Sequence, residues 1–256
     1  MKVTILGCGP SSGVPTIVGD WGACDPANPK NRRRRPSILV EADDTHVLVD
    51  ASPDLMAQLL DARATVIDAV LFTHDHADHV MGIDDLRGVR RRMGRNIDAW
   101  AAPDVLARLE RRFGYLFAGV QDPEDLYSPV FDPHVIDGPI TIGPFRDILP
   151  VAQDHGICAS LGFRFGAFAY STDVVELPAE SLAALQGVDT WIVDCLRDGP
   201  PHPTHAHLEK TLAWIDTVKP RRAILTHMNF QADYDTLKAR CPEGVEPAYD
   251  GMLFHV

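Results

Sequence analysis

The sequence lacks a long apolar segment, a pair of closely spaced cysteines and a surplus of positive charge. Its apolar runs are far shorter than the roughly 20 residues that span a bilayer, so we expect no membrane partner. The five cysteines are scattered, and no two stand at C-x-x-C spacing, which argues against a disulfide framework and a cysteine-rich zinc site. Residues 1–7 read as a first strand, without the features of a signal peptide. A cytoplasmic location is therefore expected.

The charge balance is acidic, with a formal net charge of −12. This disfavours broad binding to nucleic acid, where neutralisation of phosphates dominates affinity. A small anionic substrate remains compatible, because a local cationic site outweighs the global balance at short range. Two arginine clusters stand out, at positions 32–35 and 87–92. Each is either part of a substrate site or a solvent-facing surface.

The 256 residues and 45% apolar content suit a globular protein with a sizeable core. No long polar linker divides the chain, so we expect a single domain over residues 1–256. The early half is mostly strand followed by strand, with a hairpin turn at residues 41–45, and later strands alternate with helices. This order predicts an α/β (α+β) fold of mixed sheets covered by helices. The expected helices lie near residues 54–62, 84–93, 103–116, 179–185, 205–218 and 232–239, the fifth with Thr204 as its N-cap.

A dense set of metal-ligand side chains follows the apolar run that ends at Phe72. His74 and His76 are two positions apart, so on an extended segment both imidazoles project to the same side and bind one ion. A turn after them presents Asp78 and His79 to a second ion nearby. Two adjacent ions form the clamp used to hydrolyse phosphodiesters and other stable bonds.

Three further candidates follow later strands. His155 comes after one apolar run, Asp173 ends another, and His227 ends a third. Junctions between strands and loops commonly carry functional side chains. Each of these residues alone is more often structural, but their order after the first motif supports a shared metal site.

With these residues the sequence resembles the metallo-β-lactamase superfamily along essentially its whole length. The resemblance implies a four-layer αββα sandwich with two mixed sheets and the metal ions at one edge. It implies that one divalent ion is held by His74, His76 and His155, the other by Asp78, His79 and His227, and that Asp173 bridges both. Asp50 matches an aspartate that orients the metal loop.

The segment Gly7–Pro15, with Gly13-Val14-Pro15 and the ending Tyr249–Met252, is similar to the phosphodiesterase branch of this superfamily. That branch includes the tRNA-processing ribonuclease Z enzymes and, as the nearer match, the phosphoribosyl 1,2-cyclic phosphate phosphodiesterases. The ribonucleases insert a tRNA-gripping arm between the third histidine and the bridging aspartate. Here Asp173 follows His155 by only 18 positions, so tRNA is an unlikely partner.

His205 aligns with the histidine that these phosphodiesterases place over the leaving-group oxygen. Histidine titrates near neutral pH and is suited to protonate a departing alkoxide. The first turn of a helix, where we expect this residue, also favours nearby negative charge. The alternative is a histidine that only caps the helix.

One departure from the cyclic phosphodiesterases concerns an extra structural zinc, which they bind through closely spaced cysteines and a late histidine. Here Cys24 stands alone in its region and Phe230 occupies the late position, so we do not expect this zinc. The nearby Arg33 and Arg35 enter a strand beside the expected site. Either guanidinium is a candidate to bind a substrate phosphate in bidentate fashion.

The predicted reaction is hydrolysis of a small, cyclic or nucleotide-like phosphodiester with two zinc or manganese ions. Asp78 and Asp173 are expected to position the attacking water, while His205 contacts the substrate and protonates the leaving oxygen. The alternatives are a metallo-hydrolase of thioesters, lactones or β-lactams, a ribonuclease Z-like enzyme, and a nucleotide-binding protein with lapsed activity. The apolar surface near residues 108–117 is a candidate homodimer contact.

Overall fold

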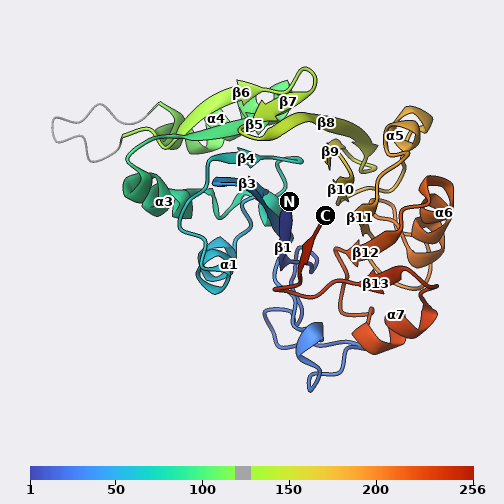
Figure 1. The fold of residues 1–256 in the computed structure, drawn as a ribbon. Coiled ribbons are helices and arrows are strands. Elements are labelled where there is room, and N and C mark those ends of the chain that lie inside the picture. Colours follow the sequence, from blue (N-terminus) through green and yellow to red (C-terminus); the bar gives the residue numbers. More distant parts are fainter. Residues whose placement is uncertain (119–127) are drawn as a thin grey trace.

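Two seven-stranded sheets stand face to face in the computed structural model, which describes residues 1–118 and 128–256 (Figure 1). The first sheet has the order β14 (Leu253–His255), β1 (Lys2–Gly7), β2 (Ser37–Ala42), β3 (Thr45–Val49), β4 (Ala69–Leu71), β5 (Ile97–Ala101) and β6 (Phe131–Val135). The second has the order β13 (Val245–Pro247), β12 (Arg222–Thr226), β11 (Thr190–Asp194), β10 (Phe168–Ser171), β9 (Ala159–Phe165), β8 (Phe145–Asp154) and β7 (Ile140–Ile142).

Both sheets are mixed, as the order of strands and helices along the sequence predicts. In the first sheet, β14, β1, β2 and β3 pair antiparallel, and β3 to β6 pair parallel. In the second, β7 to β10 pair antiparallel, and β10 to β13 pair parallel. The register of β2 with β3 closes on Ala42 opposite Thr45, which confirms the predicted hairpin turn.

Helices cover the outer face of each sheet, so the molecule has the expected four-layer αββα architecture (Figure 1). The first sheet is covered by α1 (Leu55–Ala62), α3 (Leu86–Met93) and α4 (Pro103–Phe117), and the second by α5 (Ala179–Ala184), α6 (Leu208–Val218) and α7 (Tyr234–Arg240). Three short helical turns complete the described elements: η1 (Pro29–Asn31), α2 (Ala77–Val80) and η2 (Ile83–Asp85).

Alternation along the strands divides the apolar residues between two cores. On β2, Ile38 and Val40 belong to the core between the sheets, while Leu39 belongs to the core under the helices of the first sheet. Successive side chains of a strand point to opposite faces, so one strand serves both layers. Complete burial of such a side chain stabilises the fold by about 1.5–3 kcal/mol.

The helix expected from His205 begins three residues later, at Leu208, with the extended residue His207 as its N-cap. The N-cap assignment of Thr204 is therefore wrong. The backbone of Ala206 instead donates to the Val174 carbonyl and accepts from the Leu196 amide. These two bonds hold the segment extended against neighbouring loops, so His205 lies in a loop and gains no support from a helix end.

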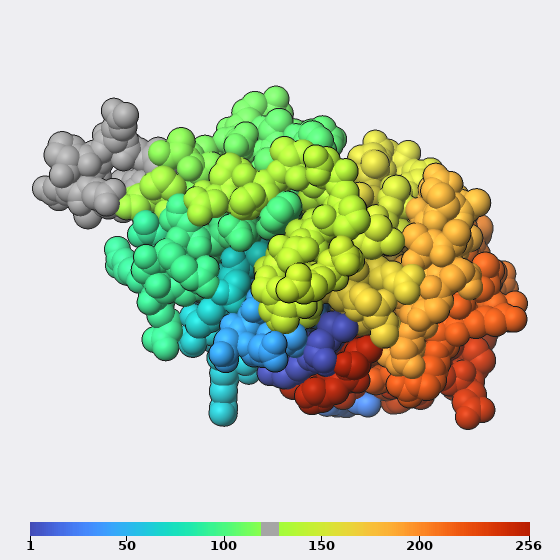
Figure 2. Space-filling model, turned by 45° about the horizontal axis from the view of Figure 1, so that its top comes forward, coloured from blue at the N-terminus to red at the C-terminus, as the bar shows by residue number. Residues whose placement is uncertain are grey.

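The two chain ends lie side by side, as the adjacent blue and red segments of Figure 2 show. The Met1 amino group donates to the Val256 carbonyl at 2.8 Å, and β1 pairs with β14. Among the described residues, none of the helices has the length and apolar character required to cross a bilayer.

Candidate metal centre

The predicted ligands come together where strands of both sheets give way to loops. His74 and His76 follow β4, and the short helix α2 carries Asp78 and His79. From the second sheet, His155 follows β8, Asp173 follows β10 and His227 follows β12. Three residues here have a left-handed backbone, with φ of 63° at Asp50, 53° at Asp173 and 59° at His227. Such strained conformations concentrate at functional sites.

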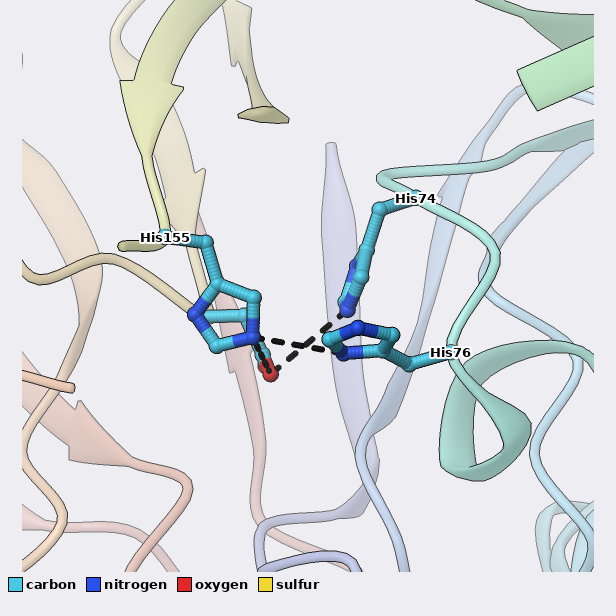
Figure 3. Close-up of side chains that lie close together, drawn as sticks. His74, His76 and His155 are labelled. Carbon is cyan, nitrogen blue, oxygen red and sulfur yellow. Dashed lines mark hydrogen bonds and ion pairs between the residues drawn. The ribbon is translucent and has the colours of Figure 1, made fainter. Parts of the chain in front are cut away.

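The first group consists of His74, His76 and His155, whose imidazoles point toward one another in Figure 3. His155 Nε2 lies 3.3 Å from His76 Nδ1. The Asp173 Oδ2 atom lies 3.4 Å from His155 Nε2 and 3.7 Å from His74 Nε2. These four residues therefore aim one atom each at a common point.

The second group consists of Asp78, His79 and His227, again with Asp173. Asp173 Oδ1 lies 3.1 Å from His79 Nε2 and 3.2 Å from His227 Nε2. Asp78 Oδ2 lies 3.5 Å from each of the same two nitrogens. Asp173 thus turns one oxygen to each group, which is the arrangement of a bridging carboxylate.

The spacing and chemistry of these atoms fit two divalent ions. Ligand atoms about 2.1 Å from a tetrahedral zinc lie about 3.4 Å from each other. The separations given above run from 3.1 to 3.7 Å, and all ligand atoms of a group lie within 4.8 Å of one another. Within the part of the chain that the structure describes, the buried Nε2 atoms of His74, His79 and His227 have no partner in hydrogen-bonding geometry. Buried polar atoms are costly unless they are paired, so metal ions coordinated by these nitrogens would satisfy all three. Imidazole and carboxylate donors suit zinc and manganese alike.

Charge and burial act differently on the two groups. Burial lowers the pKa of His74 well below its usual range and lowers that of His155 as well. Burial also opposes protonation of His79 and His227, but nearby carboxylates, Asp173 foremost, outweigh it. They raise the pKa of His79 well above its usual range and that of His227 to about 9.

The carboxylates of the second group are correspondingly held as anions. Burial raises the pKa of Asp173 and Asp78, but His227 and His79 outweigh this for Asp173, and His79 and His227 do so for Asp78. The pKa of both carboxyls therefore lies below its usual range.

Asp50 supports the metal loop from beneath, as the sequence comparison implied. Its Oδ2 lies 2.6 Å from His79 Nδ1 and accepts from the Thr73 hydroxyl at 2.8 Å, while Oδ1 accepts from the Thr73 amide at 2.9 Å. The carboxyl is fully buried. A carboxylate behind a ligand histidine fixes the orientation of the ring.

His205 stands over this cluster, with its ring stacked on that of His227 at a centroid distance of 4.5 Å. Its Nδ1 lies 2.9 Å from Asp194 Oδ2, and its Nε2 lies 3.9 Å from Asp173 Oδ2. Asp194 is fully buried at the end of β11. The pair leaves Nε2 on the side of Asp173 and the ligand cluster.

Sequence reasoning missed Asp194. The signal was present, because Asp194 ends an apolar strand as Asp173 follows one. Its partner His205, however, is positioned by a loop whose path the sequence does not show.

The structure separates the two candidate substrate arginines. Arg33 is buried, with 2% of its surface exposed, and its guanidinium donates to the carbonyls of Asn229 and Ala232. This placement contradicts its assignment as a phosphate ligand, because protein acceptors occupy the terminal nitrogens. Arg35 is half-buried and lies 3.1 Å from Asp54 through Nε. Together with Asp78 it lines a cleft of about 350 Å³.

Comparison with known proteins identifies the family. Residues 45–228 match the model of the "Beta-lactamase superfamily domain". A solved structure of a "New Diphosphatase from the PhnP Family" superposes with a TM-score of 0.89 at 31% identity, over 99% of this chain and 96% of that one.

Two curated relatives match by sequence. A ribonuclease Z of Bradyrhizobium sp. (strain ORS 278) is 32% identical over 180 residues, which are 68% of this chain and 56% of that protein. An octanoyltransferase of Porphyromonas gingivalis is 29% identical over 254 residues, 98% of this chain and 51% of that protein. The chain thus spans about half the length of these curated relatives. On the family match and the diphosphatase structure, the chain belongs to the metallo-β-lactamase superfamily.

Proposed function

We propose that the chain is a metal-dependent phosphodiesterase for small diesters, with zinc or manganese in the two ligand groups. The candidate substrates are sugar cyclic phosphates such as phosphoribosyl 1,2-cyclic phosphate, and small nucleotides. The observation that carries the proposal is the Asp194–His205 pair, which faces the bridging carboxylate of Asp173. The likeness to a diphosphatase at 31% identity supports the same class of reaction.

Divalent ions bound in these groups supply Lewis-acid polarisation of the phosphoryl oxygens and a water acidified toward neutral pH. The chain supplies orientation and proton transfer. Asp194 accepts from Nδ1 of His205, so the ring presents Nε2 to the leaving oxygen and holds a proton there for the alkoxide. Asp78 and Asp173 fix the reacting centre between the groups, and Arg35 in the adjoining cleft offers a guanidinium to a phosphate oxygen.

The short chain segment between His155 and Asp173 favours a small substrate. It consists of β9 and β10 with their turns, and so leaves no space for an inserted RNA-binding arm. The net charge of −12 also disfavours a long polyanion. Ribonuclease Z-like processing of tRNA is therefore not the function we propose.

Hydrolysis of a thioester is the second candidate function. The observation that favours it is the match to a protein named octanoyltransferase. The leaving groups distinguish the two. A thiol has a pKa near 8.5 and departs without much help from an acid, whereas an alkoxide needs a proton. A histidine held by a buried aspartate over the site is therefore better explained by a phosphodiester.

The test compares turnover of ribose 1,2-cyclic phosphate, nucleoside cyclic phosphates, bis(4-nitrophenyl) phosphate and an octanoyl thioester by the metal-loaded protein. Fast opening of a cyclic phosphate supports the proposal. Turnover of the thioester alone, with both ions bound, contradicts it and favours the second candidate.

The variant His205→Ala tests the assigned proton donor. We expect turnover of cyclic phosphates to fall roughly a hundredfold, with both ions retained. Bis(4-nitrophenyl) phosphate releases a stabilised phenolate, so its turnover should fall by less than about tenfold. His202→Ala is the matched control, because its ring lies 5.5 Å from that of His205. Loss of an ion from His205→Ala would instead make His205 a ligand.

A further inference from the structure

His227 differs from the other ligand histidines in what holds its ring. His79 is backed by Asp50, His155 Nδ1 lies 2.6 Å from the Thr204 carbonyl, and His74 Nδ1 lies 2.9 Å from the Thr73 hydroxyl. In His227 both ring nitrogens are buried, and among the described residues neither has a partner in hydrogen-bonding geometry. Ligand histidines almost always use their second nitrogen for orientation, so the direction of His227 must be set in another way.

The backbone that carries His227 is left-handed and leads, through Met228, into a tight turn over residues 229–232. The Met228 amide donates to the Cys8 carbonyl, and the Asn229 amide donates to the Leu196 carbonyl. Within the turn, the Ala232 amide donates to the Asn229 carbonyl. A non-glycine residue at φ 59° is strained and persists only where its surroundings over-determine it.

The turn is clamped at both ends by Arg33. One terminal nitrogen donates to the Asn229 carbonyl at 3.1 Å and the other to the Ala232 carbonyl at 2.7 Å. The same two nitrogens also reach Cys24 Sγ at 3.8 Å and Asn31 Oδ1 at 3.1 Å. A planar guanidinium has the fixed fork that such paired acceptors require, and a lysine ammonium does not.

Arg33 is itself fixed to the N-terminal loop. Its amide donates to the Val14 carbonyl at 2.8 Å, and its carbonyl accepts from the Val14 amide at 2.9 Å. Asn31 links the clamp to α7, because its Nδ2 donates to Asp233 Oδ2 at 2.6 Å and its Oδ1 accepts from the Tyr234 amide. Burial of an unpaired charge is expensive, so a buried arginine bonded to carbonyls indicates a defined task.

We propose that Arg33 is the positioning residue for His227, and thereby for the ion of the second group. It replaces, through the backbone of the turn, the bond to the second ring nitrogen that the other ligand histidines have. This inference rests on His227 being a ligand in the proposed two-metal site, but it does not depend on which substrate is cleaved.

The test measures metal stoichiometry and stepwise metal affinity in Arg33→Met and Arg33→Lys, with zinc as the probe. We expect both variants to keep the first ion, and to bind the second about 10–100-fold more weakly. The exposed neighbour Arg32 gives the matched control Arg32→Met, which should bind both ions as the wild type does. His227→Ala serves as the reference for a protein without the second site.

Wild-type affinity for both ions in Arg33→Met would overturn the proposal. An equal weakening of both ions in Arg33→Lys would overturn it as well. If Arg33→Met does not fold, as judged by circular dichroism, Arg33→Lys decides alone, since it keeps the charge and much of the volume. Wild-type affinity for the second ion in that variant contradicts the role of the guanidinium fork. Failure of wild-type protein to hydrolyse any diester would contradict the proposed function while leaving this metal measurement intact.

Discussion

The two halves of the metal cluster use the same kinds of side chain in different surroundings. In the first, His76 is partly exposed and its Nε2 lies 3.8 Å from the Cys158 thiol, while His155 is backed by a backbone carbonyl. In the second, all three ligands are buried, and a carboxylate lies behind His79. The first half therefore has one partly exposed ligand and neutral support, and the second is buried throughout and has anionic support.

This difference determines which imidazoles are protonated in the absence of a metal ion. Burial keeps His74 and His155 neutral at ordinary pH, because it lowers their pKa. Carboxylates raise the pKa of His79 and His227, so those rings carry protons. The first half is ready to accept an ion, whereas the second must exchange protons for one. The same anions then stabilise the ion that replaces the protons.

The largest expected effect comes from Asp173→Ala, which removes the carboxylate shared by both halves. Turnover should fall by roughly a thousandfold or more, and both ions should bind more weakly, because one oxygen faces each group. Metal analysis after dialysis and turnover of an aryl diester measure this. The control is Asp189→Ala, an aspartate paired with Arg221 on the surface. Wild-type affinity at either half would show that Asp173 does not bridge.

The pH dependence of metal affinity should separate the halves next. The His227 pKa is about 9 and that of His79 is also raised, so lowering the pH from 8 to 6 favours their protonated forms. Each displaced proton costs about tenfold in affinity per pH unit. We therefore expect the second ion to weaken by about a hundredfold or more, and the first much less. Competition titrations with a chelator at several pH values measure both, and equal slopes would contradict the contrast.

Asp50→Asn should weaken the second ion by about 10–100-fold, because His79 loses its carboxylate support. The first ion should change far less. Asp194→Asn is a matched control, since Asp194 is equally buried but supports His205 instead of a ligand. That control should keep both ions and lose turnover. An equal loss at both halves in Asp50→Asn would indicate a collapse of the whole metal loop.

The sequence predicted which side chains lie together in the cluster, because its signals are local. His74, His76, Asp78 and His79 lie within one short segment, and the remaining ligands each follow an apolar strand. The mixed sheets were predictable for a similar reason, since the order of short apolar runs, such as that of β2, and of helical patterns is visible along the sequence. The resemblance to a known family supplied the pairing of ligands and the number of layers.

Residues whose role depends on distant contacts were not predictable. Arg33 and Arg35 are two positions apart, yet only the second lines the cleft beside Asp78. The first meets carbonyls at positions 229 and 232, which no local pattern connects to it. The loop of His205 was likewise predicted as helix. It is extended instead, because hydrogen bonds to residues 174 and 196 outweigh the helical periodicity of the sequence.

Substitution of Cys158 should have the smallest effect on metal affinity, and it tests most directly why the two halves of the cluster differ. A thiol is a weak hydrogen-bonding group, so Cys158→Ala should change the affinity of the first ion by no more than about threefold. Cys158→Asp would place a carboxylate behind His76, as Asp50 stands behind His79. If anionic support causes the contrast, the affinity of the first ion should then become more steeply dependent on pH. An unchanged slope, with the variant folded, would show that burial of the second half, and not its carboxylate, produces the difference.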